Sequence, residues 1–416
     1  MDTLTAAQAL AQELTDLRHD LHRHPEIGLD LPVTQARILA ELEDLGLETT
    51  VGTDCTSVVA VLRGGASTGT APAVLLRADM DGLNVQEDTG LPWQSEVPGA
   101  MHGCGHDMHV TMLVGAARIL AAHRDELAGD VVFMFQPGEE GYDGAAVMVR
   151  EGVLDAAGPR VSSAFALHVM AAGQPQSLVQ ARSGAMLAAA DGLQVTVNGK
   201  GGHSSAPYRG VDPITVTAEM ILAMQAFVTR RFDVFDPVVV GIGAVQSGNL
   251  ASPNAMPDVA KFSASVRFWS EEARERFHTG AQNLLESIAQ AHGATVDVEH
   301  HTGYPVTITD PFEVQFVADT IASAFGEERY QVMPTPLAGS EDFSRVLNEV
   351  PGSFACIGAT PAGVDWNTAP NNHSPYAQYD DDVLPLGAAV YAEVAWRRLA
   401  ALTEASSLQD AVASNR

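Results

Sequence analysis

Apolar residues recur at helical spacing at the start of the chain and then give way to short continuous apolar runs. The helical spacing predicts helices over residues 4–21 and 33–45, the second of which is closed by Gly46. The continuous runs predict buried strands over residues 57–62, 73–76, 131–136 and 164–169. An alanine-rich apolar helix is predicted over residues 108–123. Strands that alternate with helices are typical of an α/β domain with a mixed, mainly parallel sheet.

A different pattern begins near residue 187 and lasts to about residue 303. Its predicted order is strand, helix, strand, strand, helix, strand, which is the split unit of a ferredoxin-like α+β domain. The strands are predicted over 193–197, 238–245, 262–268 and 294–299, and the helices over 213–232 and 271–291. The first pattern then returns, with helices over 311–325 and 385–402 around a strand over 353–357. We therefore expect a discontinuous domain of residues 1–186 and 304–416, interrupted by an inserted domain of residues 187–303.

Acidic residues outnumber basic residues, 52 to 23, and give the 416-residue chain a formal net charge of −29. Nucleic acids and anionic membranes bind to basic surfaces, so neither partner is expected. The first 21 residues lack the pattern of a secretory signal, and no apolar run reaches the length of a membrane span. Three cysteines without a CxxC pair do not suggest a disulfide framework. We therefore expect a globular protein of the cytoplasm.

Histidine, cysteine and glutamate residues follow the predicted strands of the first domain, where open α/β sheets place their sites. They are Cys104, His106, Glu139, Glu140, His168 and, in a later loop, His373. Thiolate, imidazole and carboxylate groups together suit Zn²⁺, Mn²⁺, Co²⁺ or Ni²⁺. Each of these residues alone would more often be an inert core cysteine or a solvated polar side chain. Their joint position at strand ends favours a metal or catalytic site.

The adjacent residues Glu139 and Glu140 follow a strongly apolar strand, where a solvated acidic surface is not expected. Neighbouring side chains in an irregular segment point in different directions, so one glutamate can bind metal while the other does not. A glutamate beside a metal-activated water is the general base that hydrolysis needs. The pair therefore indicates metal-assisted hydrolysis.

Seven segments of the sequence resemble the M20 metallopeptidases, in particular the amidohydrolase branch of that family. The segments are LHRHPE at 21–26, RADMD at 77–81, MHGCGHD at 101–107, QPGEEG at 136–141, ALH at 166–168, GGHSSAP at 201–207 and GSEDF at 339–343. The branch includes aminoacylases, hippurate hydrolases and hydrolases of indole-acetyl amino acids. The resemblance covers nearly the whole chain. It implies a phosphorylase/hydrolase-like catalytic domain, with the inserted domain serving as a lid and in dimerisation.

The resemblance also implies a site that holds two divalent metal ions. The implied ligands are Cys104, which would bridge the ions, and His106, Glu140, His168 and His373. Glu139 would be the general base, and Asp79 would orient a metal ligand. Related peptidases take a metal histidine from the segment that matches residues 77–81, which holds no histidine here. His106 would substitute for it, and this departure favours the amidohydrolase branch over the peptidases.

Three residues of the inserted domain are further candidates. His203 matches a family histidine that helps to hold the oxyanion, often in the active site of the partner subunit. Without the resemblance, the segment around His203 would be interpreted only as a turn. Asn254 and Arg267 are candidates for binding the substrate carboxylate, Arg267 through its forked guanidinium. A salt bridge on the strand surface explains Arg267 equally well.

These features predict hydrolysis of the amide bond of small N-acyl-L-amino acids with an acetyl, benzoyl or related acyl group. One alternative is a dipeptidase or carboxypeptidase of the same family. Another is a metal-binding protein without catalytic activity, against which the complete set of ligands and Glu139 argues. The expected assembly is a homodimer, or a tetramer.

Overall fold

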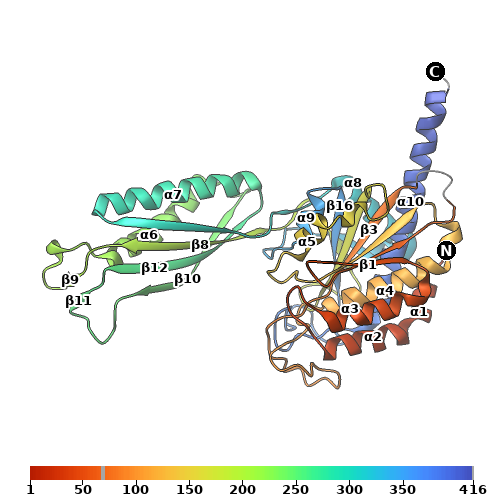
Figure 1. The fold of residues 1–416 in the computed structure, drawn as a ribbon, viewed down its shortest axis with the longest axis horizontal. Helices are drawn as coiled ribbons and strands as arrows, with labels where there is room; N and C mark the ends of the chain where they lie inside the picture. The colour runs from red at the N-terminus through yellow and green to blue at the C-terminus, as the bar shows by residue number, and fades with distance from the viewer. Residues whose placement is uncertain (67–70, 415–416) are drawn as a thin grey trace. The chain divides into compact units, whose positions relative to one another are not determined.

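The computed structural model describes residues 1–66 and 71–414, and side chains within these ranges up to residue 407. The chain divides into two compact units (Figure 1). Unit 1 consists of Met1–Met186, Ile308–Thr335 and Asp342–Arg416, and unit 2 of Leu187–Thr307 and Pro336–Glu341. The sequence pattern does not indicate that the short segment 336–341 belongs with the inserted residues.

Unit 1 is built on an eight-stranded sheet with the strand order β1-β2-β4-β3-β5-β16-β6-β15. Its strands are β1 (Glu48–Val51), β2 (Val58–Leu62), β3 (Ala73–Asp79), β4 (Asp130–Gln136), β5 (Ser163–Met170), β6 (Val179–Ala181), β15 (Tyr330–Val332) and β16 (Gly352–Gly358). The central strands β4, β3, β5 and β16 run parallel, whereas β2 and β6 pair antiparallel with them. The predicted α/β class with a mixed, mainly parallel sheet is therefore confirmed. A separate two-stranded ladder joins β7 (Gly184–Leu187) and β14 (Thr307–Thr309).

Helices pack on the sheet of unit 1. They are α1 (Thr3–Ala9), α2 (Ala11–Arg23), α3 (Pro32–Leu42), α4 (His106–Ala122), α5 (Gly144–Arg150), α8 (Pro311–Phe325), α9 (Ser344–Leu347), α10 (Leu384–Ser414) and the 3-10 helices η1 (Glu43–Leu45), η2 (Arg124–Glu126), η3 (Val153–Asp155), η5 (Glu327–Arg329) and η6 (Asp381–Val383). Helices α4 and α10 pack against each other and against β3, and α8 packs against β16. Helix α4 is buried on nearly all sides, which explains its apolar sequence. Within the described residues, no helix combines the length and apolar character needed to cross a membrane.

Two helices of unit 1 differ from the sequence prediction. The single helix predicted over residues 4–21 is two helices, because the chain turns at Leu10 between α1 and α2. Neither glycine nor proline marks this turn, so apolar spacing alone could not reveal it. The helix predicted over 108–123 begins earlier, at His106, directly after Gly105. His106 is therefore the first residue of a buried helix.

The register of the central strands places four polar residues on one face of the sheet, Arg77, Asp79, Gln136 and His168. Asp79 pairs with Gln136 across β3 and β4, and Arg77 pairs with Ala166, two residues before His168. Side chains alternate along a strand, so residues two positions apart share a face. Asp79, Gln136 and His168 also lie at or near the C-terminal ends of their strands. The segments that follow these strands therefore meet at one edge.

Unit 2 contains a four-stranded antiparallel sheet with the order β10-β12-β8-β13. Its elements are β8 (Ala189–Asn198), β9 (Gly202–His203), η4 (Pro207–Arg209), α6 (Pro213–Arg231), β10 (Val238–Ser247), β11 (Ala255–Met256), β12 (Val259–Phe268), α7 (Glu271–His292) and β13 (Thr295–Thr302). The four sheet strands and two helices follow the predicted β-α-β-β-α-β order, so the ferredoxin-like architecture is confirmed. A small ladder pairs β9 with β11.

Candidate metal and catalytic centre

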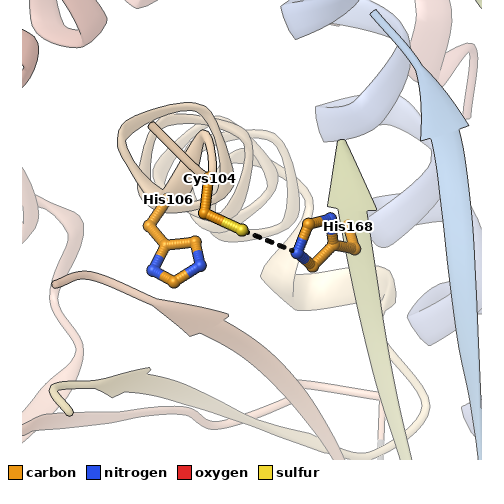
Figure 2. A group of neighbouring side chains, drawn as sticks. All are labelled: Cys104, His106 and His168. Carbon is orange, nitrogen blue, oxygen red and sulfur yellow. Dashed lines mark hydrogen bonds between the residues drawn. The ribbon is translucent and has the colours of Figure 1, made fainter. Parts of the chain in front are cut away.

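Ligand-type side chains from distant parts of the chain converge on the thiol of Cys104. Its Sγ lies 3.4 Å from Nε2 of His168 and 3.3 Å from Nε2 of His373. Nε2 of His373 also lies 3.2 Å from Oε1 of Glu140. His106 and His168 lie on opposite sides of the thiol in Figure 2. Two groups share Cys104, one with His106 and His168 and one with Glu140 and His373, and within each the ligand atoms lie within 4.8 Å of one another.

The chemistry of these side chains fits divalent metal ions. His106 is completely buried, yet neither of its ring nitrogens forms a hydrogen bond with the residues that the structure describes. A buried polar group without a hydrogen bond costs about 1–3 kcal/mol, and metal coordination would remove that cost. Thiol, imidazole and carboxylate donors together suit borderline ions such as Zn²⁺. Cys104 belongs to both groups, as a bridging ligand must.

The turn that carries Cys104 depends on glycine. Gly105 has a φ of 84°, in the left-handed region that a β-carbon disfavours. A β-carbon at this position would also lie 2.4 Å from Cγ2 of Val169 on β5. The same turn is held by Tyr379, whose hydroxyl donates to the carbonyl of Gly103 at 2.8 Å. This close approach brings Cys104 to the strand that carries His168.

Asp81 holds the segment that carries the two glutamates. Its Oδ1 accepts the N–H of Glu139 at 3.1 Å, and its Oδ2 accepts the N–H of Glu140 at 3.0 Å. Its Oδ1 also lies 3.4 Å from Nδ1 of His106. Asp81 is not among the residues predicted from the sequence. Its position just after β3, at the edge where the strand ends meet, is the signal that could have revealed it.

Asp79 lies next to His106 in a completely buried position. Its Oδ2 accepts a hydrogen bond from Nη1 of Arg77 at 2.8 Å and lies 3.5 Å from Nε2 of His106. Its Oδ1 lies 2.5 Å from Nδ1 of His109. Burial opposes ionisation, but Arg77 and the two imidazoles outweigh it and hold the pKa of Asp79 well below its usual value. Asp79 is therefore a carboxylate placed where an orienting acid would act on His106.

The imidazoles of the centre differ in their electrostatic surroundings. Burial lowers the pKa of His168 well below its usual value. Burial acts in the same direction on His106, but the nearby Asp79 carboxylate and cysteine thiol outweigh it and raise the pKa of His106 well above its usual value. Hydrogen bonds with the thiol of Cys104 and the carboxylate of Glu140 raise the pKa of His373 to about 10. Negative charge therefore surrounds His106 and His373, which favours a cation there.

The backbone fixes which nitrogen of His168 faces the thiol. Nδ1 of His168 donates to the carbonyl of Val169 at 2.8 Å, because a carbonyl can only accept. In the neutral ring, the lone pair then lies on Nε2, which is the nitrogen nearest to Cys104. A neutral imidazole with one nitrogen unprotonated is the form that binds metal ions.

Of the candidates in unit 2, the structure brings His203 and Asn254 together. β9, which contains His203, pairs with β11, which begins directly after Asn254, and the carbonyl of Asn254 accepts the N–H of Ser204 at 3.0 Å. Arg267 lies at the opposite end of β12 from this ladder. The eight residue steps from Val259 to Arg267 span about 27 Å of strand. The two residues predicted to bind the substrate carboxylate are therefore far apart within unit 2.

Comparison with known proteins gives concordant matches. The profile of Peptidase family M20/M25/M40 matches residues 75–397. The IAA-amino acid hydrolase ILR1-like 4 of Arabidopsis thaliana is 37% identical over 402 residues, which cover 95% of this chain and 87% of that protein. Thermostable carboxypeptidase 1 of Saccharolobus solfataricus is 33% identical, with 95% and 98% covered. Hippurate hydrolase of Campylobacter jejuni is also 33% identical, with 94% and 97% covered.

Solved structures share the fold as well. The crystal structure of a dinuclear metal-binding peptidase of the M20 family from Bacillus subtilis superposes with a TM-score of 0.80 at 30% sequence identity. The superposition covers 94% of this chain and 99% of that one.

Proposed function

The chain belongs to peptidase family M20/M25/M40 and is a hydrolase of amide bonds, and from this premise we propose that it hydrolyses small N-acyl-L-amino acids. The observation that carries the proposal is the convergence of metal-ligand side chains beside Glu139. The converging residues are Cys104, His106, Glu140, His168 and His373. The names of two relatives, an IAA-amino acid hydrolase and a hippurate hydrolase, support an acyl amino acid as the substrate.

The converging side chains would hold two divalent ions, with Cys104 shared between the two groups. Zn²⁺, Mn²⁺, Co²⁺ and Ni²⁺ all suit this set of donors. When bound, such ions polarise the amide carbonyl and lower the pKa of the attacking water. Asp79 and Asp81 lie on either side of His106 and would fix its ring orientation.

Glu139 is the proposed general base. Its side chain is buried, and its backbone N–H is held by Asp81. A carboxylate oxygen of Glu139 lies within 4.8 Å of ligand atoms of His106 and Glu140. Glu139 accepts a proton from the attacking water as the new carbon–oxygen bond forms. It then gives this proton to the leaving nitrogen as the carbon–nitrogen bond breaks, which releases a carboxylic acid and an amino acid.

His203 is the proposed donor to the oxyanion. Its Nδ1 accepts the N–H of Ser205 at 3.2 Å and lies 2.8 Å from the Oγ of the same residue. A backbone N–H can only donate, so the proton of the neutral ring lies on Nε2. Nε2 of His203 is therefore a hydrogen-bond donor, as stabilisation of a negatively charged oxygen requires.

The separation of Arg267 from His203 and Asn254 supports a homodimer. A small acyl amino acid is much shorter than the about 27 Å of strand that separates the two ends of β12. One substrate molecule therefore cannot contact both ends of the same unit 2. We infer that the two ends serve different active sites, as they do when two chains pair, and that Arg267 and Asn254 each contact a substrate carboxylate or carbonyl.

We assign the pairing of two chains to strand β10. Among the described residues it pairs only with β12, and its sequence VVVGIGAVQS carries no charge. The opposite edge strand β13 carries Asp297, Glu299 and two histidines. Charged side chains protect an exposed strand edge from pairing, and β10 lacks this protection. Its open row of backbone groups is suited to a second β10.

A hydrolysis screen tests the proposed function. Protein stripped of metal and then supplied with Mn²⁺, Co²⁺ or Zn²⁺ is assayed with acetyl-, benzoyl-, long-acyl- and indole-acetyl amino acids. We expect hydrolysis of at least one acyl amino acid, and only after metal is restored. Dipeptides and longer peptides are included because one relative is named as a carboxypeptidase. Faster cleavage of peptides than of every acyl amino acid would assign the chain to the peptidases instead.

We place the protein in the cytoplasm. Cys55 and Cys104 are buried and form no disulfide, and reduced cysteines suit a reducing compartment. Detection of the protein in isolated cell fractions tests this assignment, and recovery outside the cytoplasmic fraction would contradict it.

A further inference from the structure

The side chain of Asn372 links three segments of the centre. Its Nδ2 donates to the carbonyl of Val169 at 3.0 Å and to the carbonyl of Cys104 at 3.3 Å. Its Oδ1 accepts the N–H of Ala171 at 2.9 Å. Asn372 therefore contacts the turn of Cys104 and the end of β5, and it directly precedes His373 in the chain.

The neighbours of Asn372 fix the orientation of its amide group. The N–H of Ala171 can only donate, and the carbonyls of Val169 and Cys104 can only accept. If the oxygen and nitrogen of the amide exchanged places, each of these hydrogen bonds would be lost. The carbonyl of Val169 is also the acceptor for Nδ1 of His168. Asn372 thus supports the same carbonyl that fixes the ring of a proposed metal ligand.

His373 needs such an anchor more than His106 and His168 do. His106 lies on α4 and His168 lies on β5, whereas His373 lies on a loop and its side chain is 54% exposed. Its φ of 70° is in the left-handed region, which a β-carbon disfavours. Its backbone N–H donates to the carbonyl of Gly103 at 2.8 Å. The loop therefore holds an unfavourable conformation that its contacts must maintain.

We propose that Asn372 is a positioning residue that sets the affinity of the chain for the metal ion held by Cys104, Glu140 and His373. This inference rests on the proposed metal centre. Asn372 acts by holding the His373 loop against β5 and against the turn of Cys104. Outer residues that support metal ligands commonly change metal affinity by about 10–100-fold when they are replaced.

The test is a titration of the full-length, metal-stripped protein with Zn²⁺ in competition with a chromophoric chelator. We expect two ions for each wild-type chain. Asn372→Asp keeps the acceptor for the N–H of Ala171 but loses the three contacts that Nδ2 donates, to the carbonyls of Val169 and Cys104 and to Sγ of Cys104. We expect it to weaken the binding of one of the two ions by about 10–100-fold. Asn372→Ser, whose shorter side chain lacks the donating amide nitrogen and adds no charge, should give the same selective loss.

Asn371→Asp is the matched control. This variant adds the same charge one residue away. It keeps a side-chain oxygen in the place of Oδ1 of Asn371, which accepts the backbone N–H of Asn372 at 2.9 Å. Its affinities should stay within about twofold of wild type. In a His373→Ala background, Asn372→Asp should cause a smaller further loss, because only its contacts with Cys104 and Val169 can still act.

Two results would overturn the inference. The first is that Asn372→Asp and Asn372→Ser both bind the two ions with wild-type affinity. The second is that Asn372→Asp lowers metal affinity as much in the His373→Ala background as it does in the wild-type background. A wild-type chain that binds no metal would instead overturn the proposed function as a whole. Thermal unfolding of each metal-free variant separates these outcomes from failure to fold.

Discussion

Nε2 of His109 accepts the backbone N–H of Val169 at 2.8 Å. In the neutral ring the proton must then lie on Nδ1, which donates to Oδ1 of Asp79 at 2.5 Å. The buried imidazole of His109 on α4 therefore holds two residues. One is Asp79, whose carboxylate lies beside His106, and the other is Val169, which follows His168 on β5. His109 is not among the residues predicted to carry the chemistry, yet it contacts the supports of two proposed ligands.

We expect His109→Leu to destabilise the metal-free protein by about 2–4 kcal/mol, because a buried carboxylate and a buried N–H would each lose a partner. His109→Gln can donate to Asp79 and accept from Val169, so it should recover much of the loss. Urea unfolding of both variants and the wild type measures the difference. Equal stabilities of the leucine and glutamine variants would contradict the assigned hydrogen bonds.

Glu139→Gln should lower kcat by about 10²–10⁴-fold, because an amide cannot carry the proton from water to the leaving nitrogen. Metal content should stay at the wild-type level. Steady-state kinetics with the best acyl amino acid from the screen, together with metal analysis, checks both statements. Glu126→Gln, at an exposed position on η2, is the control. Normal turnover by metal-loaded Glu139→Gln would rule out this residue as the base.

Gly105→Ala should abolish binding of at least one metal ion, because the added β-carbon would lie 2.4 Å from Cγ2 of Val169 and would displace the turn of Cys104. Gly99→Ala is a matched control. Gly99 has a similar φ of 77°, but its β-carbon would meet nothing within 4 Å. Both variants carry the left-handed strain of about 1–2 kcal/mol, and only Gly105→Ala carries the clash. Metal analysis that does not distinguish the two variants would refute the close-packing argument.

The ion pair of Asp191 and Arg274 in unit 2 predicts a pH effect on stability. Burial raises the pKa of Asp191, but hydrogen bonds from Arg274 and from the N–H of Gly303 outweigh burial, so the pKa is lowered. A lowered pKa in the folded state stabilises the protein above the unfolded value of about 3.9, and this contribution is lost as the pH falls through the folded value.

Asp191→Asn should therefore reduce the free energy of unfolding at pH 7 by about 1–3 kcal/mol. The difference between variant and wild type should shrink as the pH is lowered below about 4. Urea unfolding of the full chain across this range provides the measurement. A difference that stays constant down to the lowest pH would show that the charge of Asp191 contributes nothing.

Val245→Lys on β10 should convert a dimer into a monomer, because a charged side chain on an exposed edge strand prevents pairing. Val245 is 58% exposed, so the substitution should not disturb the fold of the single chain. Val364→Lys, on an exposed loop of unit 1, is the control. Light scattering at micromolar concentration measures the mass. A wild-type monomer would contradict the proposed pairing.

The elements that the sequence predicts well are those with strong local signals. Helix α8 begins at Pro311 after the capping residue Asp310 and ends before Gly326, and its predicted bounds, 311–325, agree with the structure. Strand β1 (Glu48–Val51) was missed because it is exposed at every position and has no apolar period. The break at Leu10 was missed because neither glycine nor proline marks it.

The same distinction applies to the candidate centre. Cys104, His106, Glu140 and His168 could be selected because metal-ligand types follow consecutive strands, and the structure brings them together. The residues that hold them were not predictable in this way. Asn372 contacts residues that lie about 200 or more positions away, and nothing in the loop sequence indicates which carbonyl its amide meets. Such contacts exist only once the chain has folded.

The order of the ligands along the chain also constrains synthesis. Cys104 and His373, whose side chains meet at 3.3 Å, are separated by 269 positions in the sequence. The whole of unit 2 lies between them in the chain. A nascent chain on the ribosome therefore has its inserted unit complete before it has the last of the proposed metal ligands. Any incomplete product that stops before residue 373 would lack one of the proposed ligands, so the proposed centre requires the nearly full-length polypeptide.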